Sequence, residues 1–427
     1  LEEAVMKSIR ILIFMGTLAF PGLVSAQENT FKSVLQGFIE TALKNNPAIK
    51  AFQHRIKAAQ EVPSQVSSLD DPILQFQLMN LPVDTFDLSQ EAVTQKQFSL
   101  SQKLPYPGKL GLKAEIAEKN IAITQQDLEE ARLSITRDVK LAFYELCFVL
   151  AATNITRENK TLLEQFVTIA ESKYSVGKGL QQDVLKAQVE LTKIMEQLIE
   201  FQKLAGIEKA RLNSLMNLLP QETLTIPHGI AKTDFIFTVP GLQVIAEKHR
   251  PLLSKIRSLK ERYGTSKKLA EKEYYPNFNV GLKYGQRQEA RNIDRPDFVS
   301  AWVGINIPIW YKTKQSRRVL ETTYKVEMAG ETYNKAKNQI FLKIKELVDK
   351  ERQGGKTLAL IEQGILPQAR QSLESALAGY SVDKVDFLTL LNNQVTLFKW
   401  QIRYHRELTD YEKNLAVIEQ SAGKNLF

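Results

Sequence analysis

An alternating stretch of polar and apolar residues occurs twice in this chain, and the repeat limits its possible folds more than any other feature. The first stretch follows Pro72, and the second follows Pro276, 204 positions later. A second pair of prolines, Pro47 and Pro251, precedes the two stretches at the same spacing. An internal repeat of this length indicates a chain built from two similar halves.

Each half is predicted to contain two short strands, because side chains alternate with a period of two. The expected strands are about 72–81, 97–104, 276–285 and 298–307. One strand face is apolar and includes Leu74, Phe76, Leu78, Phe278, Val280 and Leu282. The opposite face is polar and includes Gln75, Gln77, Ser99, Asn277, Asn279 and Lys283. Phe298 and Trp302 interrupt the pattern, since they fall on the polar face.

The alternation has two explanations, which the residues alone leave open. A soluble antiparallel sheet with one wet face shows it, and so does a strand that crosses a membrane. Strands of about ten residues have the length that a tilted membrane-spanning strand needs. Four strands cannot close a barrel, and open edges do not face lipid. A membrane position therefore requires several copies, and three copies of four strands would give twelve.

The rest of each half is predicted to be helical. In the first repeat, 27–217, we expect long helices at about 109–173 and 181–217, which form an antiparallel hairpin. A helix of some 65 residues would extend roughly 100 Å. A shorter helical stretch at about 31–69, broken at Pro47, precedes the strands. The fold class is therefore mainly α with a small β part.

The second repeat, 241–427, follows the same order after a proline-containing linker at 218–240. We expect one helix at about 241–273, and long helices at about 313–378 and 385–421. Pro367 interrupts the first of the long helices, so a kink is expected near Gln363.

The N-terminal residues 1–26 have the pattern of a signal peptide. A basic start at Met6–Arg10 is followed by an apolar core, and Val24-Ser25-Ala26 suits a signal peptidase. Residues 1–5 precede a plausible initiator, Met6. Export implies an oxidising compartment, but Cys147 is the only cysteine, so no disulfide can form within the chain.

Composition and motifs disfavour several classes of function. The net charge is +9, but acidic and basic residues are interleaved, which is not typical of nucleic-acid binding. No run of about 18 apolar residues follows the N-terminus, which disfavours transmembrane helices. No catalytic motif, phosphate-binding loop or metal-ligand spacing is found. We therefore expect no enzyme activity, no cofactor and no metal site.

The duplicated order of helix, strand pair and long helical hairpin resembles the TolC-like outer-membrane efflux proteins. Motifs that carry the resemblance are Asn45-Asn46-Pro47, Asp71-Pro72, Tyr275-Pro276, Tyr174–Gly177 and Asp183–Leu185. Pro105–Lys109 and Ile365–Ala369 are most similar to the heavy-metal (CzcC/CusC-like) branch. The resemblance covers essentially the whole chain after the signal peptide.

The resemblance implies a homotrimer with a shared 12-stranded β-barrel in the bacterial outer membrane and a helical tunnel in the periplasm. Such a protein is the passive export duct of a tripartite efflux pump. Its partners are a periplasmic adaptor (membrane fusion) protein and an inner-membrane transporter of the resistance-nodulation-division type. Heavy-metal cations are one expected substrate. The alternatives are a type I secretion or drug-efflux duct of the same fold, and an exported coiled-coil scaffold with a soluble sheet.

The resemblance also assigns roles to residues. The polar strand face would line the pore. Asp183 and Asp386 match the first acidic position of the periplasmic entrance, but Lys186 and Thr389 occupy the second. The alternative is that both aspartates only cap the returning helices. The two helical turns are the segments that connect the long helices of each hairpin, at 174–180 and 380–385. They would dock the adaptor through Tyr174, Val176, Gly177, Tyr380, Val382 and Asp383.

Overall fold

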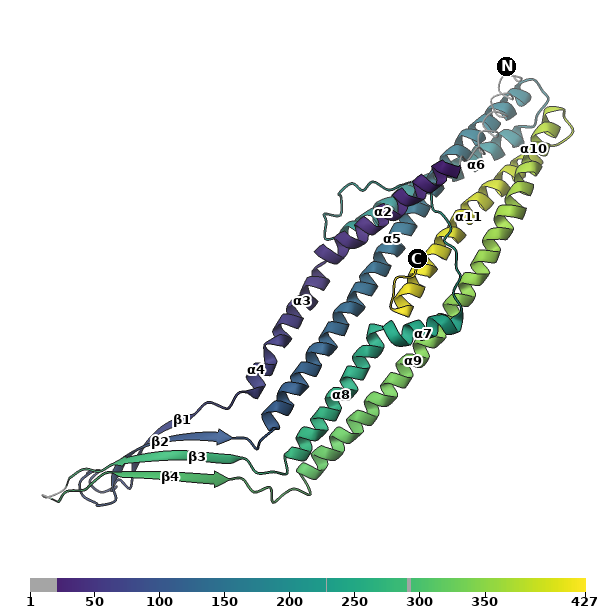
Figure 1. Ribbon diagram of the computed structural model, residues 1–427. Helices are drawn as coiled ribbons and strands as arrows, with labels where there is room; N and C mark the ends of the chain where they lie inside the picture. Colours follow the sequence, from purple (N-terminus) through teal and green to yellow (C-terminus); the bar gives the residue numbers. More distant parts are fainter. Residues whose placement is uncertain (1–20, 228, 290–292) are drawn as a thin grey trace. The chain divides into compact units, whose positions relative to one another are not determined.

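The computed structural model describes residues 21–227, 229–289 and 293–427 (Figure 1). Most of the expected signal peptide lies outside the described residues, and residues 21–26 begin the first helix. The helices are α2 (Pro21–Asn45), α3 (Pro47–Gln60), α4 (Val62–Ser67), α5 (Lys109–Ser175), α6 (Gln181–Leu215), α7 (Val239–His249), α8 (Pro251–Lys272), α9 (Gln315–Leu360), α10 (Leu366–Ser381) and α11 (Phe387–Ala422). The strands are β1 (Ile73–Met79), β2 (Gln95–Leu104), β3 (Phe278–Gln286) and β4 (Phe298–Ile305).

Prolines set several helix boundaries. The expected single helix over about 241–273 is two helices, α7 and α8, because Pro251 disfavours helical backbone at Arg250. The equivalent break at Pro47 separates α2 from α3. Here the Asn46 side chain accepts a hydrogen bond from the amide of Ala48 at 2.9 Å and donates one to the carbonyl of Leu215 at 2.9 Å.

The two long helical hairpins differ in their first helices. In the first repeat, α5 is continuous over 67 residues. In the second repeat, a π-helical turn, η1 (Ile361–Ile365), separates α9 from α10. Pro367 follows this turn and lacks the N–H that a regular helix would use. The wider turn accommodates the missing bond at the position where a kink was expected.

The four strands form one antiparallel sheet in the order β1-β2-β3-β4. The strand pairs of the two repeats are neighbours, since β2 pairs with β3 (Figure 1). One row across the sheet consists of Phe76, Phe98, Tyr284 and Val299. Because directly opposite residues share a face, the register places the apolar positions of all four strands on the same side.

Contacts between residues divide the chain into two compact units, whose boundaries differ from those of the two repeats. We call residues 51–129 with 251–338 the strand unit, because it contains the whole sheet. The remaining described residues, which include both helical turns, form the turn unit. Each unit therefore takes segments from both halves of the sequence.

The core of the turn unit is formed by α5, α6, α10 and α11. The rings of Phe166 and Phe387 are 6.5 Å apart, and that of Tyr380 lies 5.7 Å from Phe387. Among the described helices, α5 alone has an 18-residue window apolar enough to cross a membrane (mean hydropathy 1.3), but 61% of the window is buried inside the protein. Burial of this kind is typical of a core helix.

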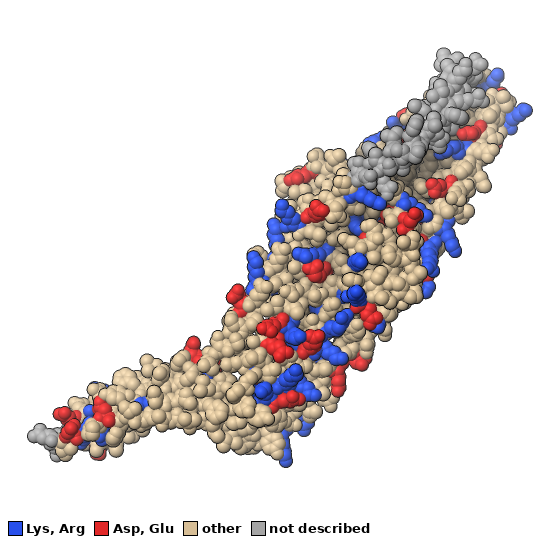
Figure 2. All heavy atoms as spheres, in the orientation of Figure 1, with Lys and Arg blue, Asp and Glu red and all other residues tan. Residues whose placement is uncertain are grey.

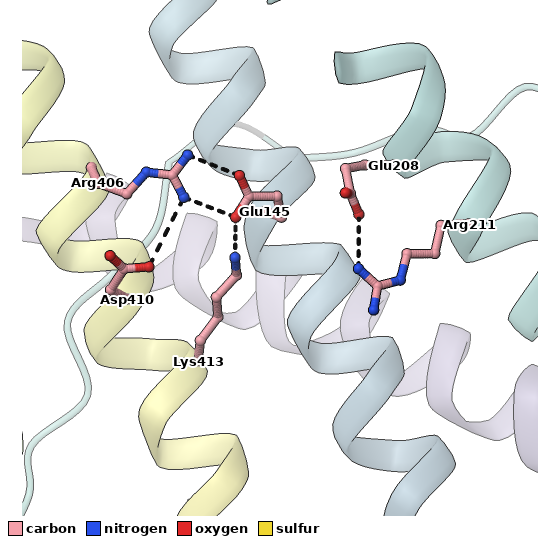
Figure 3. Close-up of polar contacts among 6 residues, drawn as sticks. All are labelled: Glu145, Glu208, Arg211, Arg406, Asp410 and Lys413. Carbon is pink, nitrogen blue, oxygen red and sulfur yellow. Dashed lines mark hydrogen bonds and ion pairs between the residues drawn. The ribbon is translucent and has the colours of Figure 1, made fainter. Parts of the chain in front are cut away.

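Polar side chains also tie the helices of the turn unit together. Both terminal guanidinium nitrogens of Arg406 on α11 donate to the carboxylate of Glu145 on α5 at 2.9 Å, and Lys413 donates to the same carboxylate (Figure 3). Burial opposes ionisation of Glu145, but these hydrogen bonds lower its pKa below the ordinary value. The Arg406 guanidinium also lies 3.7 Å from the centroid of the Phe148 ring. A nearby pair on α6, Glu208 and Arg211, is 3.8 Å apart.

A buried carboxylate, Glu351, lies between α9 and α11. It is 1% exposed, and it accepts a hydrogen bond from Asn414 at 2.5 Å while its other oxygen has no partner. Burial raises its pKa from 4.5 to about 7. A second buried glutamate, Glu412, belongs to α11. It accepts hydrogen bonds from the amide of Thr233 at 2.7 Å and from the hydroxyl of Thr233 at 3.0 Å, and these bonds hold the linker against α11.

We expect the contribution of Glu351 to the stability of the protein to decrease as the pH rises from about 4.5 through 7. The raised pKa of Glu351 means that the folded state keeps a proton that the unfolded state releases in this interval. Glu351→Gln should weaken this dependence and raise the melting temperature at pH 8 by roughly 3 °C or more. The control is Glu374→Gln, an exposed glutamate of α10. Equal pH profiles for both variants would contradict the assignment.

Candidate functional site

The polar face of the sheet brings together side chains from both repeats. Gln75, Ser99 and Lys283 form one row across β1, β2 and β3. Gln77 pairs with Gln97 in the next row, and Asn279 pairs with Lys103 near the opposite end. Five of the six expected pore-lining residues therefore share one face, and the sixth, Asn277, lies just before β3.

The apolar face of the sheet remains open to its surroundings. Leu74 is 74% exposed, Phe76 is 55% exposed, and the rings of Phe76 and Phe98 are 5.0 Å apart. In Figure 2 the visible surface of the strands carries few charges, and the charged side chains gather in the loops at their end. A large uncovered apolar face normally marks a contact with lipid or with another protein.

Trp302 breaks the alternation because it packs over a glycine. A Cβ at Gly281 would lie 2.4 Å from the indole nitrogen of Trp302, the residue that pairs with Gly281 in the register. The indole therefore lies against the bare backbone of β3. Phe298, the second exception, lies under the Arg287 guanidinium, which is 4.0 Å from its ring centroid.

Asn277 has a defined role at the junction of strands and helices. Its side-chain oxygen accepts hydrogen bonds from the amide of Tyr106 at 3.0 Å and from the ammonium of Lys109 at 2.8 Å. Lys109 also donates to the carbonyl of Tyr275 at 2.8 Å, and the rings of Tyr106 and Tyr275 stack at 4.6 Å. Sequence reasoning missed this joint, because the two segments lie about 170 positions apart and a lysine in a turn is usually solvated.

The two helical turns are joined by an ion pair. Asp383 has a left-handed backbone (φ 56°) at the position where the first turn has Gly177 (φ 72°). The Lys173 ammonium donates to the Asp383 carboxylate at 2.6 Å and lies 4.1 Å from the centroid of the Tyr380 ring. This hydrogen bond lowers the pKa of Asp383. An aspartate is thus retained where glycine would be less strained.

The expected docking residues are not equally accessible. Tyr174, Val176 and Val382 are exposed. Tyr380, however, is only 8% exposed. Its ring packs against Phe387 and under the Lys173 ammonium, so it presents little surface of its own.

Asp386 and Asp183 differ in their surroundings. Asp386 is the N-cap of α11 and accepts hydrogen bonds from the Thr389 amide at 2.8 Å and from its hydroxyl at 2.9 Å. These bonds lower the pKa of Asp386. Asp183 lies in the first turn of α6, whose N-cap is Leu180. Capping therefore accounts for Asp386 but not for Asp183, and the Asp386 carboxylate is exposed as well.

A groove of about 810 Å³ lies between α5, α6 and α11 in the turn unit. Its lining includes the apolar residues Leu185, Val189 and Leu388 and the cations Lys186 and Lys399. In the described part of the chain, no three His, Cys, Asp or Glu side chains come close enough together to hold a metal ion.

Comparison with known proteins identifies relatives of this chain. Residues 38–218 match the family "Outer membrane efflux protein". "Toxin and drug export protein A" of Aggregatibacter actinomycetemcomitans is 24% identical over 52% of this chain and 49% of its own length. "Cobalt-zinc-cadmium resistance protein CzcC" of Cupriavidus metallidurans is 21% identical over 74% of each chain. The chain spans about half the length of the first two curated relatives that it matches.

Solved structures share the fold over nearly the whole chain. The outer membrane protein VceC of Vibrio cholerae has a TM-score of 0.78 at 17% identity, covering 93% of this chain and 98% of its own. CusC has a TM-score of 0.78 at 14% identity, covering 92% of both chains. The CmeC outer membrane channel of Campylobacter jejuni has a TM-score of 0.74 at 14% identity, covering 91% and 85%.

Long helical hairpins joined to short strand pairs are the fold that these solved outer-membrane proteins share. Together with the sequence match of residues 38–218, the fold confirms the resemblance to the TolC-like outer membrane efflux proteins. Its sequence similarity to CzcC agrees with the likeness to the heavy-metal branch.

Lys173→Gln should loosen the turn between α10 and α11, because it removes the ion pair with Asp383. The amides of Asp383 and Lys384 donate within the turn at 3.3 and 2.9 Å, so their hydrogen exchange should become several-fold faster. The melting temperature should change little, since the Asp383 carboxylate is exposed and an ion pair with an exposed partner contributes little to stability. Lys193→Gln, which removes the exposed ion pair with Glu190 on α6, is the control. Equal exchange rates in the two variants would show that the pair does not order the turn.

Proposed function

We propose that this protein is the outer-membrane channel of a tripartite efflux pump, a passive export duct from the periplasm to the outside. The observation that carries the proposal is the sheet, which has an uncovered apolar face, a polar face and two open edges at β1 and β4. Backbone groups at an open edge cannot remain unpaired in lipid. Pairing β4 of one copy with β1 of the next satisfies these groups and places the polar face inside.

The proposed assembly is a homotrimer, in which three sheets of four strands close a barrel of twelve strands. The repeats 27–217 and 241–427 each supply one strand pair and one long helical hairpin, and residues 218–240 link them. The groove along α6 and α11 has an apolar lining that a neighbouring copy would cover. The fold neighbours are themselves outer-membrane channels, which supports the location.

Within this proposal, the polar strand face lines the pore, with Gln75, Gln77, Ser99, Asn279 and Lys283 on it. Asp183 and Asp386 lie at the periplasmic entrance. The turns form the docking surface for a periplasmic adaptor through Tyr174, Val176, Gly177, Val382 and Asp383, with Tyr380 beneath. An inner-membrane transporter of the resistance-nodulation-division type supplies the energy, since the family and fold are those of channel proteins and not of enzymes.

Heavy-metal cations are the substrate class that we propose first, because the relative that matches this chain over 74% of both lengths is a cobalt-zinc-cadmium resistance protein. Drugs or protein toxins are the second candidate, because another relative is named a toxin and drug export protein. Comparing metal and drug tolerance of cells that lack the gene would separate the two.

Phe76→Lys should reduce the yield of trimer in outer-membrane fractions at least tenfold, because it places a charge on the lipid-facing side near the middle of β1. The matched control is Gln77→Lys, which adds the same charge at the next position on the opposite face. It should assemble normally, because its side chain reaches the aqueous pore. Equal trimer yields for the two variants would contradict the face assignment, and loss of both would contradict the pore.

Asp386→Asn should weaken cation selectivity and cation block in single-channel recordings, because it removes a ring of three charges from the entrance. Asparagine caps a helix as well as aspartate does, so the turn should stay folded. Asp386→Ser, which also retains a cap without a charge, should behave in the same way. Unchanged selectivity in both variants would leave Asp386 with the capping role alone.

A further inference from the structure

The segment that follows β4 exposes a series of apolar and aromatic side chains. Trp310 is 71% exposed, and Ile307, Ile309 and Tyr311 are exposed as well. They follow directly in the chain after Val303 and Ile305, which belong to the open apolar face of the sheet. The apolar surface proposed to contact lipid therefore continues past the last strand into this segment.

The segment is ordered by its own backbone. The carbonyl of Trp310 accepts hydrogen bonds from the amides of Thr313 at 3.1 Å and Lys314 at 3.0 Å, and from the Thr313 hydroxyl at 3.2 Å. The carbonyl of Tyr311 accepts one from the amide of Ser316 at 2.8 Å. The side chains of this turn are thus presented from a fixed backbone.

Three cations follow the aromatic residues and have no ion-pair partner in the part of the chain that the structure describes. Lys312, Lys314 and Arg317 are exposed, and none of the ion pairs among the described residues includes them. The first turn of α9 contains no acidic residue either. Positive charges are unfavourable at the positive end of a helix dipole. Three unbalanced cations beside exposed aromatic rings are complementary to an anionic, partly apolar surface.

The exposure of Lys312 is not shared by the equivalent lysine of the first repeat. A lysine stands four positions after the closing proline in both halves: Lys109 after Pro105, and Lys312 after Pro308. Lys109 is buried and bonded to the Asn277 side chain and the Tyr275 carbonyl. Lys312 points outward instead. The junction after β4 therefore exposes its cations, whereas the junction after β2 holds its lysine in internal hydrogen bonds.

We infer that the segment 307–317 binds the headgroups of anionic phospholipids in the membrane leaflet nearest the helices. Tryptophan and tyrosine favour the headgroup level of a bilayer, and each basic residue near an anionic surface strengthens binding roughly fivefold. Trp310 and Tyr311 lie at the interface, and Lys312, Lys314 and Arg317 contact the lipid phosphates. This inference rests on the proposed insertion of the sheet into a membrane.

The test compares two triple variants of the full-length protein purified from membranes in mild detergent. The junction variant, K312Q/K314Q/R317Q, removes the three cations, and the control variant, K345Q/R352Q/K356Q, removes the same residue types from exposed positions further along α9. Binding of phosphatidylglycerol and of phosphatidylcholine is measured by native mass spectrometry. We expect the wild type and the control variant to bind phosphatidylglycerol more tightly than phosphatidylcholine. In the junction variant, the ratio of the two affinities should fall at least tenfold.

Each outcome has a distinct meaning. Equal phosphatidylglycerol preference in the two variants would overturn the inference while leaving the channel intact. Loss of trimer in the junction variant alone would show that a second copy of the chain covers the segment, which also overturns it. If wild type failed to enter membranes or to conduct in bilayers, the proposed function itself would be wrong, together with the lipid contact that depends on it.

Discussion

The open edges of the four-stranded sheet are the constraint on which the rest of the structure depends. The sheet has unpaired backbone groups at β1 and β4, and one of its faces is apolar and uncovered. A single chain cannot satisfy both the edges and the face in lipid or in water. Duplication within the chain doubles the number of strands, and in the proposed trimer the association of copies closes the sheet. The long helices would then associate in the same symmetry.

Much of the fold could be predicted from the sequence, because alternating residues mark the strands, with Phe298 and Trp302 as exceptions, and apolar residues at helical spacing mark the long helices. Alternation along 72–81 and 276–285 fixed both the strands and their faces, and the register aligns these faces across the sheet. The break at Arg250 was missed, although Pro251 mirrors Pro47. Long-range contacts were also beyond sequence reasoning. The sequence around Lys109 and Lys173 does not indicate that they bond to Asn277 and Asp383, because those partners come from the other repeat.

The two repeats differ at equivalent points in their charges and in their turns. Lys109 is inside and Lys312 is outside; Gly177 is neutral, while Asp383 is paired with Lys173. Such differences leave the element order intact. They also mean that a ring formed by three copies would alternate between two kinds of junction and two kinds of turn.

The π-helical turn after α9 has a mechanical consequence. A regular helix resists bending evenly along its length, but a segment with a widened turn, Gly364 and Pro367 has fewer regular bonds to oppose bending. Bending of the second hairpin is therefore concentrated within a few residues, whereas the uninterrupted helix α5 resists bending along its whole length. Under a load at its turns, the chain would flex at one point in one of its two hairpins, and three such points would be related by the symmetry of the assembly.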